Sequence, residues 1–335
     1  MRTLLVDGDN LFKIGFHGVR EFYVDGEHIG GVFHFVNTLR KQVDEYDYDK
    51  VVVFWDGIGN SSVRREIYPK YKLNRRQTMN EYQHESYRYQ KERVKQYLEE
   101  CFIRQIRVDN NEADDLIAYY CSIGNNEQKV ILSADQDLIQ LISPTTSIYS
   151  PIKKFFIRNG EKINMLGQQI PHENVRTIKV IMGDKSDNID GISLMGDKTF
   201  LKFFPEVVDR VVNVSDILER GQQLLEEHKS NKALMNLVKG ITKDGEFGSE
   251  FFDRNKKIVD LLNPLISDEG KEMVELYYRE TLDPEGRGSK NLIRMMTEDG
   301  FFKYLPKDDE AFVNFVKPFT KLTRKEKRKF NQENN

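Results

Sequence analysis

Five short acidic motifs, spread over the first 190 residues, constrain the fold of this 335-residue chain more than any other feature. We expect each motif at the end of a strand, because an apolar run followed directly by a carboxylate is typical of a buried parallel strand. The carboxyl ends of such strands meet at one edge of the sheet, where open α/β sheets bind ligands. The motifs read LLVDGDN, VVVFWDG, EADD, SADQD and GDKSDN. Their carboxylates are Asp7, Asp56, Glu112, Asp114, Asp115, Asp135, Asp137, Asp184 and Asp187.

Carboxylates gathered at one sheet edge would repel one another, and burial would raise the pKa of several of them. Only a strong counter-charge makes such a cluster tolerable, and two divalent cations with oxygen ligands are the natural candidate. Any single motif could instead be an ordinary turn or the acidic first turn of a surface helix. Because all five occur in order, the sequence predicts a metal site.

The EADD motif restricts the local geometry. On a regular helix Glu112 and Asp115 share a face, whereas Asp114 points well away from Glu112. If both Glu112 and Asp114 reach a metal, residue 112 must lie before the helix or at its N-cap.

The spacing of apolar residues predicts an α/β fold. Core strands are expected at residues 3–6, 51–55, 103–108 and 129–133, with amphipathic helices between them at 34–46 and 81–101. Alternating strands and helices favour a parallel, doubly wound sheet with helices on both faces. We also expect a strand and hairpin over residues 149–160.

Residues 57–80 lack a core pattern and are basic and rich in tyrosine, which indicates a mobile insertion directly after Asp56. Beyond Asp187 the chain is expected to be mainly helical. From about Thr323 it is expected to be disordered.

Net charge is −3, but the charges are strongly segregated. Residues 64–76 carry six basic residues and one acid, and residues 317–329 carry seven and one. Positive stretches beside a metal-neutralised acidic cleft suit a polyanionic backbone, although a solvated charged face is the alternative for each run.

The remaining composition excludes several classes. No apolar run approaches the 18 residues of a membrane span, and strand-like residues from Thr3 leave no signal peptide pattern. Cys101 and Cys121 form neither a disulfide framework nor a CxxC pair, which favours a reducing cytoplasm.

Taken together, the motifs from Asp7 to GDKSDN resemble those of the 5′-nuclease superfamily: flap endonucleases, the 5′-nuclease domains of bacterial DNA polymerase I, and phage 5′→3′ exonucleases. Arg65 and the segment Tyr68–Arg75 (YPKYKLNR) resemble the arch of that family, and the resemblance covers roughly residues 1–205. The SPIKKFFI and GRGSK segments are most similar to the phage ribonuclease H branch.

Two positions depart from the family pattern. Asp9 stands where the family usually has Asn, Ser or Thr, and we expect it beside the metal ligands rather than among them. Leu194 replaces the middle glycine of the turn at residues 191–199, which in the family joins two helices, grips the duplex backbone and often holds a monovalent cation. The helix pair is expected to remain, and the K⁺ site is put in question.

The resemblance implies a domain organisation. It consists of an α/β nuclease core over residues 1–183 with a basic arch insertion at about 57–100. A mainly helical DNA-binding region follows over 184–320, with a helix-turn-helix-like element near 184–205. A basic flexible tail covers 321–335.

The resemblance also implies two-metal phosphodiester hydrolysis with Mg²⁺, for which Mn²⁺ substitutes. The first metal would be held by Asp7, Asp56 and Asp114. The second would be held by Glu112, Asp135, Asp137 and Asp187, with Asp115 and Asp184 bridging or binding through water. Lys72 and Arg75 would act on the scissile phosphate. The expected DNA-binding residues are Arg64, Arg65, Tyr71, Arg76, Lys185, Lys198 and Thr199. Tyr71 would stack on an unpaired base or pack within the arch.

The implied function is that of a structure-specific 5′ nuclease. Its substrates would be DNA and RNA/DNA duplexes with a free 5′ end or flap, and it would remove RNA primers and flaps during replication. It would act as a monomer in the cytoplasm (of the host, if phage-encoded), with single-stranded DNA-binding protein and a sliding clamp as partners.

Two alternatives stay open. LLVDGDN and GDKSDN also resemble motifs of haloacid-dehalogenase phosphatases, but this interpretation leaves EADD and YKLNR unexplained. The other is a catalytically silent DNA-structure-binding protein, which cleavage of a labelled flap with and without Mg²⁺ would distinguish.

Overall fold

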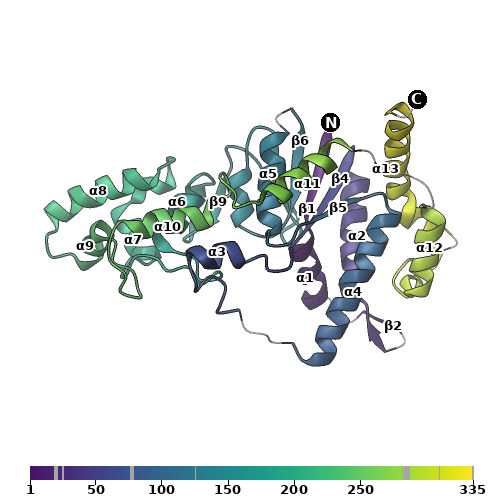
Figure 1. Ribbon diagram of the computed structural model, residues 1–335, viewed down its shortest axis with the longest axis horizontal. Helices are drawn as coiled ribbons and strands as arrows, with labels where there is room; N and C mark the ends of the chain where they lie inside the picture. Colours follow the sequence, from purple (N-terminus) through teal and green to yellow (C-terminus); the bar gives the residue numbers. More distant parts are fainter. Residues whose placement is uncertain are drawn as a thin grey trace.

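A six-stranded sheet forms the centre of the protein (Figure 1). The computed structural model describes residues 1–18, 22–24, 26–75, 79–124, 126–280, 282, 287–308 and 310–333. The strand order is β5-β4-β1-β6-β7-β8, in which neighbours pair in parallel except β8, which is antiparallel to β7. The strands are β1 (Arg2–Asp7), β4 (Lys50–Trp55), β5 (Arg104–Arg107), β6 (Gln128–Leu132), β7 (Thr146–Ser150) and β8 (Phe155–Ile157). The parallel sheet predicted from the apolar runs is confirmed.

Helices cover both faces of this sheet, as expected. One apolar core joins the sheet to α1 (Gly8–Gly18), α2 (Gly30–Glu45), α4 (Glu81–Glu100), α12 (Ser289–Glu298) and α13 (Ala311–Glu333). The other face packs against α5 (Ala113–Ile123), the short helix η1 (Asp137–Leu141) and α11 (Asp268–Arg279). A two-stranded ribbon, β2 (Tyr23–Val24) and β3 (Glu27–His28), precedes α2. In the described ranges, the helices are all too short or too polar to cross a membrane.

A separate helical lobe extends from one side of the sheet, at the left of Figure 1. Its elements are the hairpin β9 (Lys162–Met165) and β10 (Gln168–Pro171), α6 (Asn174–Met182), α7 (Asp197–Phe203), η2 (Pro205–Val208), α8 (Val214–Glu227), α9 (Lys232–Lys239) and α10 (Glu250–Val259). The lobe has its own apolar core, to which Tyr68 and Tyr71 contribute from the segment after α3 (Ser62–Ile67). The basic segment therefore packs against the lobe, which explains why it shows no core pattern of its own.

The helical lobe and the helical region expected from the sequence have different bounds. We expected a mainly helical region over residues 184–320, and the described residues there are mainly helical, but those from 268 onward pack against the nuclease core. Helix α11 packs against α5, and α12 and α13 pack against α2 and α4. The lobe is therefore formed by residues 162–259.

The prediction of a flexible tail over 321–335 is wrong for the residues that the structure describes. Helix α13 continues to Glu333, and Leu322 is buried in the core. Glu326 is fully buried and pairs with Arg104 at the edge strand β5, with 3.0 Å between Oε2 and Nη2. The sequence prediction missed an apolar helix face, from Phe315 through Phe319 to Leu322, because lysines and arginines dominate the composition of this segment.

Glu326→Ala should destabilise the fold strongly, because it leaves the buried Arg104 guanidinium without its counter-ion. Loss of one partner from a buried pair costs about 3–5 kcal/mol. Chemical denaturation should show this decrease, and Arg328→Ala, at an exposed position of the same helix, should change stability little. Equal effects of both changes would contradict the placement of Glu326.

The turn before α7 explains a departure noted in the sequence. Leu194 has a φ of +64° and its side chain is 59% exposed. The left-handed conformation costs a residue other than glycine about 1–2 kcal/mol, which accounts for the glycine that the family places there. The turn is nevertheless anchored, since Ser193 N–H donates to Ile241 O (2.9 Å) and Asn236 Nδ2 donates to Ser193 O (3.1 Å). Helix α7 begins at Asp197 and the preceding helix, α6, ends at Met182, so the helix-turn-helix-like element expected near 184–205 stays a prediction.

Candidate active site

Four of the five acidic motifs lie at the carboxyl edge of the sheet. Asp7 is the last residue of β1, Asp56 follows β4, and the SADQD motif follows β6. The EADD motif begins five residues after β5. The fifth motif was expected after a strand but follows helix α6, because residues 174–182 are helical.

Hydrogen bonds hold Asp7 in place. Its Oδ2 accepts a hydrogen bond from Ser133 Oγ (2.9 Å) and its Oδ1 accepts one from the Asn10 N–H (3.1 Å). Burial, together with the neighbouring carboxylates of Asp135 and Asp56, raises the pKa of Asp7 to about 7. The folded protein therefore resists ionisation of this carboxyl group.

The N-terminus of α5 joins two motifs. Asp56 Oδ1 accepts a hydrogen bond from the Ala113 N–H (3.0 Å), and Glu112 is the N-cap residue, as the spacing of EADD required. Glu112 Oε2 accepts hydrogen bonds from Lys72 Nζ (2.7 Å) and the Tyr71 hydroxyl (3.1 Å). Its Oε1 is buried and has no hydrogen-bond partner among the described residues. An unpartnered buried carboxylate oxygen is costly unless a cation binds it.

Asp114 and Asp135 complete this first group of acids. Burial raises the pKa of both. The charge of Asp135 raises that of Asp114 further, and the charge of Asp187 adds to the effect at Asp135. We refer to Asp7, Asp56, Glu112, Asp114 and Asp135 as the inner acid cluster.

Asp115 and Arg64 are placed differently from the sequence prediction. Arg64 is buried, and its Nη1 and Nη2 donate to the two oxygens of Asp115 at 2.5 and 3.0 Å. Asp115 also accepts the Leu265 N–H (3.0 Å), and Arg64 Nε donates to Ile258 O (3.0 Å). Asp115 is therefore not available to a metal, and Arg64 is not available to DNA. The reason is helical geometry, since adjacent helix residues point in different directions and only Asp114 can face the cluster.

A second group of acids surrounds Lys179 of α6. Its Nζ donates to Asp184 Oδ2 (2.6 Å) and also pairs with Asp137 Oδ1. Burial alone would raise the pKa of Asp184, but Lys179 and two hydrogen bonds from Ser186 hold that pKa below its ordinary value. Sequence reasoning missed Lys179. Its one available signal was a lone lysine inside the apolar stretch Val175–Met182.

The arch segment meets the fifth motif at Asp187. Arg75 Nη2 donates to Asp187 Oδ1 (2.7 Å), the Tyr71 hydroxyl donates to Oδ2 (3.2 Å), and the Lys72 N–H donates to the Asp187 carbonyl (2.8 Å). Lys72 has a φ of +56°, which is uncommon away from functional sites and tight turns. Tyr71 is 2% exposed, so its ring is buried with the apolar core of the lobe and is not available to stack on a base.

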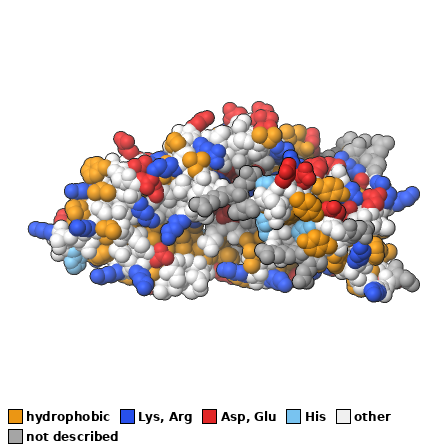
Figure 2. Space-filling view, turned by 90° about the horizontal axis from the view of Figure 1, so that it is seen from below, with side chains coloured by type: hydrophobic (Ala, Val, Ile, Leu, Met, Phe, Trp, Pro, Cys, Tyr) orange, Lys and Arg blue, Asp and Glu red, His pale blue; other side chains and the backbone are white. Residues whose placement is uncertain are grey.

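A groove of about 680 Å³ lies between the sheet edge and the lobe. Asp135, Lys179, Asp184 and Lys185 line it. Lys185 and Lys198 are exposed, Thr199 is half-buried, and Arg65 is exposed with its Nε donating to Tyr71 O (3.1 Å). Arg76 lies outside the described residues. Figure 2 shows Lys and Arg side chains distributed over the lobe, in the left half of the view.

Asp9 behaves as expected of a residue beside the ligands. Its Oδ1 pairs with Lys91 Nζ (2.6 Å) and its Oδ2 accepts the Asp56 N–H (2.9 Å). Both oxygens are thus already bonded, and Asp9 supports Asp56.

The inner acid cluster is better suited to a divalent cation than the acids around Lys179 and Arg75. No three His, Cys, Asp or Glu side chains within the described ranges form a ready-made metal cage. The inner acid cluster nevertheless suits a hard cation, because its donors are oxygens, Glu112 Oε1 lacks a partner among the described residues, and burial keeps the pKa of Asp7, Asp114 and Asp135 raised. Asp137 and Asp184 instead share one ion-pair partner, Lys179, and Asp187 pairs with Arg75.

Comparison with known proteins identifies the family. The family model described as 5′-3′ exonuclease, N-terminal resolvase-like domain, matches residues 2–171. The chain belongs to the 5′→3′ exonuclease family. The predicted 5′-nuclease superfamily is confirmed, and the haloacid-dehalogenase alternative is dropped. Membership of the phage ribonuclease H branch stays a prediction.

Curated relatives are similar over most of this chain. The 5′-3′ exonuclease of Halalkalibacterium halodurans is 32% identical over 213 residues, which are 59% of this chain and 67% of the relative. That of Buchnera aphidicola is 28% identical over 235 residues, or 69% and 79%. DNA polymerase I of Bacillus caldotenax is 28% identical over 254 residues, but the chain spans only 28% of that protein's length.

Solved structures show the same fold. The T5 5′-exonuclease with bound zinc ions has a TM-score of 0.62 at 19% identity, covering 96% of this chain and 100% of the other. A complex of the T5 D15 flap endonuclease with DNA and metal ions gives 0.61 at 19%, covering 97% and 100%.

The metal-free protein should lose stability as pH rises from about 4 to 7. The pKa of Asp7 rises from its ordinary 3.8 to about 7 on folding, so across this range the folded state binds more protons than the unfolded state and its free energy of unfolding falls. Thermal unfolding in a chelator, at pH 5 and at pH 7.5, should show a smaller decrease for Asp7→Asn than for the wild type. Asp44→Asn, at an exposed position, should retain the full decrease. An unchanged pH response in Asp7→Asn would refute this account.

Proposed function

We propose that this protein is a divalent-metal-dependent 5′ nuclease that hydrolyses phosphodiesters near a free 5′ end or flap. The observation that carries the proposal is the inner acid cluster at the carboxyl edge of the sheet, where Asp7 and Glu112 are buried and Glu112 Oε1 has no hydrogen-bond partner among the described residues. Lys72 and Arg75 lie at its rim, where a scissile phosphate would meet both the acids and two positive charges.

The inner acid cluster would hold one Mg²⁺ or Mn²⁺, which when bound would activate water and stabilise the leaving oxygen. The sequence predicts a second ion at Glu112, Asp135, Asp137 and Asp187, with Asp115 and Asp184 bridging or binding through water. Binding at Asp137 and Asp184 requires Lys179 to leave them, because its ammonium group is already paired with both. A K⁺ ion at the turn of Leu194 stays a prediction.

The arch residues would prepare the phosphate for attack. Lys72 is held by its backbone at Asp187 and by its ammonium group at Glu112, so its side chain is pre-positioned and only 11% exposed. The guanidinium of Arg75 is 52% exposed and can contact substrate while still paired with Asp187. Lys72 thus supplies a fixed charge and Arg75 a more accessible one.

Substrate grip would come from the lobe and the groove beside it. Arg65, Lys185 and Lys198 are exposed to solvent, and Thr199 lies next to Lys198 at the start of α7. We propose that duplex DNA lies along this groove, with the single-stranded 5′ end near Arg75. Arg64 and Tyr71 support the arch from within and do not contact DNA.

The biological role follows as a proposal. DNA and RNA/DNA duplexes would be substrates, and removal of RNA primers and flaps during replication would be the purpose, in the cytoplasm and as a monomer. Single-stranded DNA-binding protein and a sliding clamp are proposed partners. The support is the family membership, together with relatives named DNA polymerase I and 5′-3′ exonuclease.

Adjacent residues of α5 provide a matched test. Asp114→Asn should abolish Mg²⁺-dependent cleavage of a 5′-labelled flap while preserving folding, because it removes a charge from the inner acid cluster. Asp115→Asn should instead lower thermal stability, because it breaks the buried pair with Arg64, which normally costs about 3–5 kcal/mol. Activity retained by Asp114→Asn would refute the site, and a folded wild type that binds flaps in Mg²⁺ without cleaving them would favour a silent DNA-binding protein.

Lys72→Ala should slow the chemical step by about 100-fold or more, as loss of one electrostatic donor from such a site usually does. Single-turnover cleavage rates should show this, whereas binding titrations should show a much smaller change. Lys70→Ala is the control, since Lys70 is half exposed on the same segment and pairs with Asp244. A loss confined to affinity would make Lys72 an ordinary phosphate contact.

A further inference from the structure

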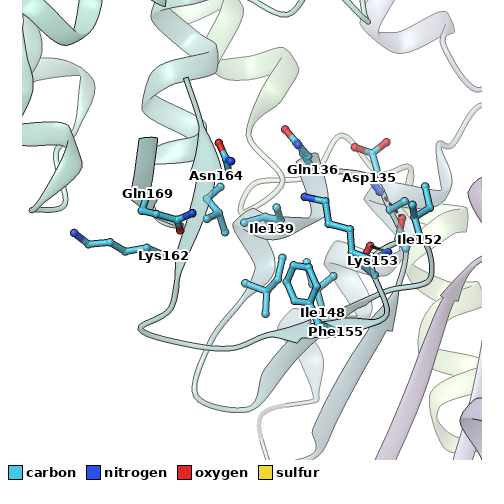
Figure 3. Close-up of a pocket in the computed structure, with 15 residues that line it drawn as sticks. Asp135, Gln136, Ile139, Ile148, Ile152, Lys153, Phe155, Lys162, Asn164 and Gln169 are labelled. Carbon is cyan, nitrogen blue, oxygen red and sulfur yellow. Dashed lines mark hydrogen bonds between the residues drawn. The ribbon is translucent and has the colours of Figure 1, made fainter. Parts of the chain in front are cut away.

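A cavity of about 400 Å³ beside the inner acid cluster has no role in the chemistry proposed so far (Figure 3). It lies between the loop 133–136, strands β7 and β8, and the β9–β10 hairpin. Ser133 and Asp135 line it, and Ser133 also donates its hydroxyl hydrogen bond to Asp7. The cavity therefore adjoins the cluster through two residues that belong to or support it.

The floor of the cavity is apolar. Ile139, Ile148 and Ile163 are buried and present their side chains to it. Phe155 extends the same surface, and Figure 3 shows its ring beside Ile148. Phe155 is 45% exposed, so a large part of its side chain is free to contact a bound molecule.

The rim of the cavity is polar and unpaired. Asn164 of β9 and Gln169 of β10 are directly opposed across the hairpin, so their side chains lie on the same face of it, and both line the cavity. Neither carboxamide has a hydrogen-bond partner in the part of the chain that the structure describes, and each offers two donors and one acceptor group. Lys153, on the opposite rim, lies over the Phe155 ring (5.9 Å) and forms no ion pair with a described residue. Lys162, in contrast, is already paired with Asp209 (3.1 Å).

The loop that separates the cavity from the acids is rigid. The Ala134 N–H donates to Asn10 Oδ1 (3.0 Å), the Asp135 N–H to Ser133 Oγ (3.0 Å) and the Asp137 N–H to Asp135 Oδ1 (2.9 Å). Ala134, Asp135 and Gln136 also line the groove on the lobe side. The cavity and that groove therefore meet at a fixed wall, and a chain molecule in the groove can place its next unit in the cavity.

We propose that this cavity binds one unpaired nucleobase of the polynucleotide substrate, adjacent to the scissile phosphate. The base would stack on Phe155 over the isoleucine floor, the carboxamides of Asn164 and Gln169 would bind its edge, and Lys153 would bind the neighbouring phosphate. This inference rests on the proposed function, because it requires a polynucleotide at the acid cluster.

The chemistry of the cavity favours a base over other occupants. A free inorganic anion would gain nothing from the apolar floor, and an aliphatic chain would leave the paired carboxamides unsatisfied. A flat aromatic ring with donors and acceptors at its edge satisfies both surfaces, and Lys153 suits the phosphate attached to it. A base in a duplex is stacked and paired, so only an unpaired one can enter.

Single-turnover cleavage of flap substrates that each lack one base near the junction would test the pocket. The wild type should lose rate or affinity by about tenfold at one position, since stacking on an aromatic ring contributes on that order. Phe155→Ala should lower cleavage of the intact flap by a similar factor and should abolish the extra loss at that same position. The double variant Asn164→Ala/Gln169→Ala should reduce the positional loss in part. Circular dichroism would verify that each variant is folded.

Phe302→Ala is the matched control, because Phe302 is similarly exposed (52%) in a segment whose neighbours pack with α12 and α13. It should behave like the wild type on every substrate. The pocket is refuted if the missing base and Phe155→Ala reduce cleavage independently, if no single position is sensitive, or if Phe302→Ala reproduces the effect. Failure of the proposed function is distinguishable, since the wild type would then cleave none of the substrates.

Discussion

The burial of like charges at one edge of the sheet is the constraint on which the rest of the structure depends. Strands β1, β4 and β6 end close to acids, and burial together with neighbouring carboxylates raises the pKa of Asp7 and Asp135. The protein compensates with basic side chains from elements distant in sequence. These are Lys91 of α4, Arg64 of α3, Lys72 and Arg75 of the arch, and Lys179 of α6. Charge neutralisation thus connects the arch and the lobe to the sheet.

Arg64 and Lys72 divide this task between structure and chemistry. Arg64 has a structural role, since its guanidinium donates to both oxygens of Asp115 and to the Ile258 carbonyl of α10. Lys72 pairs with Glu112 Oε2, which Arg64 Nη1 also approaches at 3.7 Å, and a backbone hydrogen bond to Asp187 orients Lys72. The ammonium group of Lys72 is thus fixed beside Glu112. Loss of Arg64 would loosen the arch, whereas loss of Lys72 would leave the arch in place without its charge.

The sequence predicted what local patterns encode. Apolar runs ending in carboxylates located four parallel strands, and the spacing of EADD required Glu112 at an N-cap, which the structure confirms. The sequence did not predict which charged side chains are buried, because their burial depends on partners that are distant in the chain. A basic run contains both Arg64, which is buried against Asp115, and Arg75, which is half exposed, and composition cannot separate them. The tail was misjudged because Glu326 looks like one charge among many until its partner Arg104 is known.

The number of metal ions that the site can bind depends on the position of Lys179. A divalent ion near Asp137 and Asp184 competes with an ammonium group that is already bonded to both and shielded from water. Within the described part of the chain, Glu112 Oε1 has no hydrogen-bond partner that would compete in this way. The two positions therefore differ in affinity, and the inner acid cluster should fill first. The lysine can move toward an arriving phosphate, because a phosphate offers it the negative charge that the metal removes from the two aspartates. Binding of the substrate and of the second metal would then be coupled. The phosphate would draw Lys179 away from the two aspartates, and the metal would take its place there.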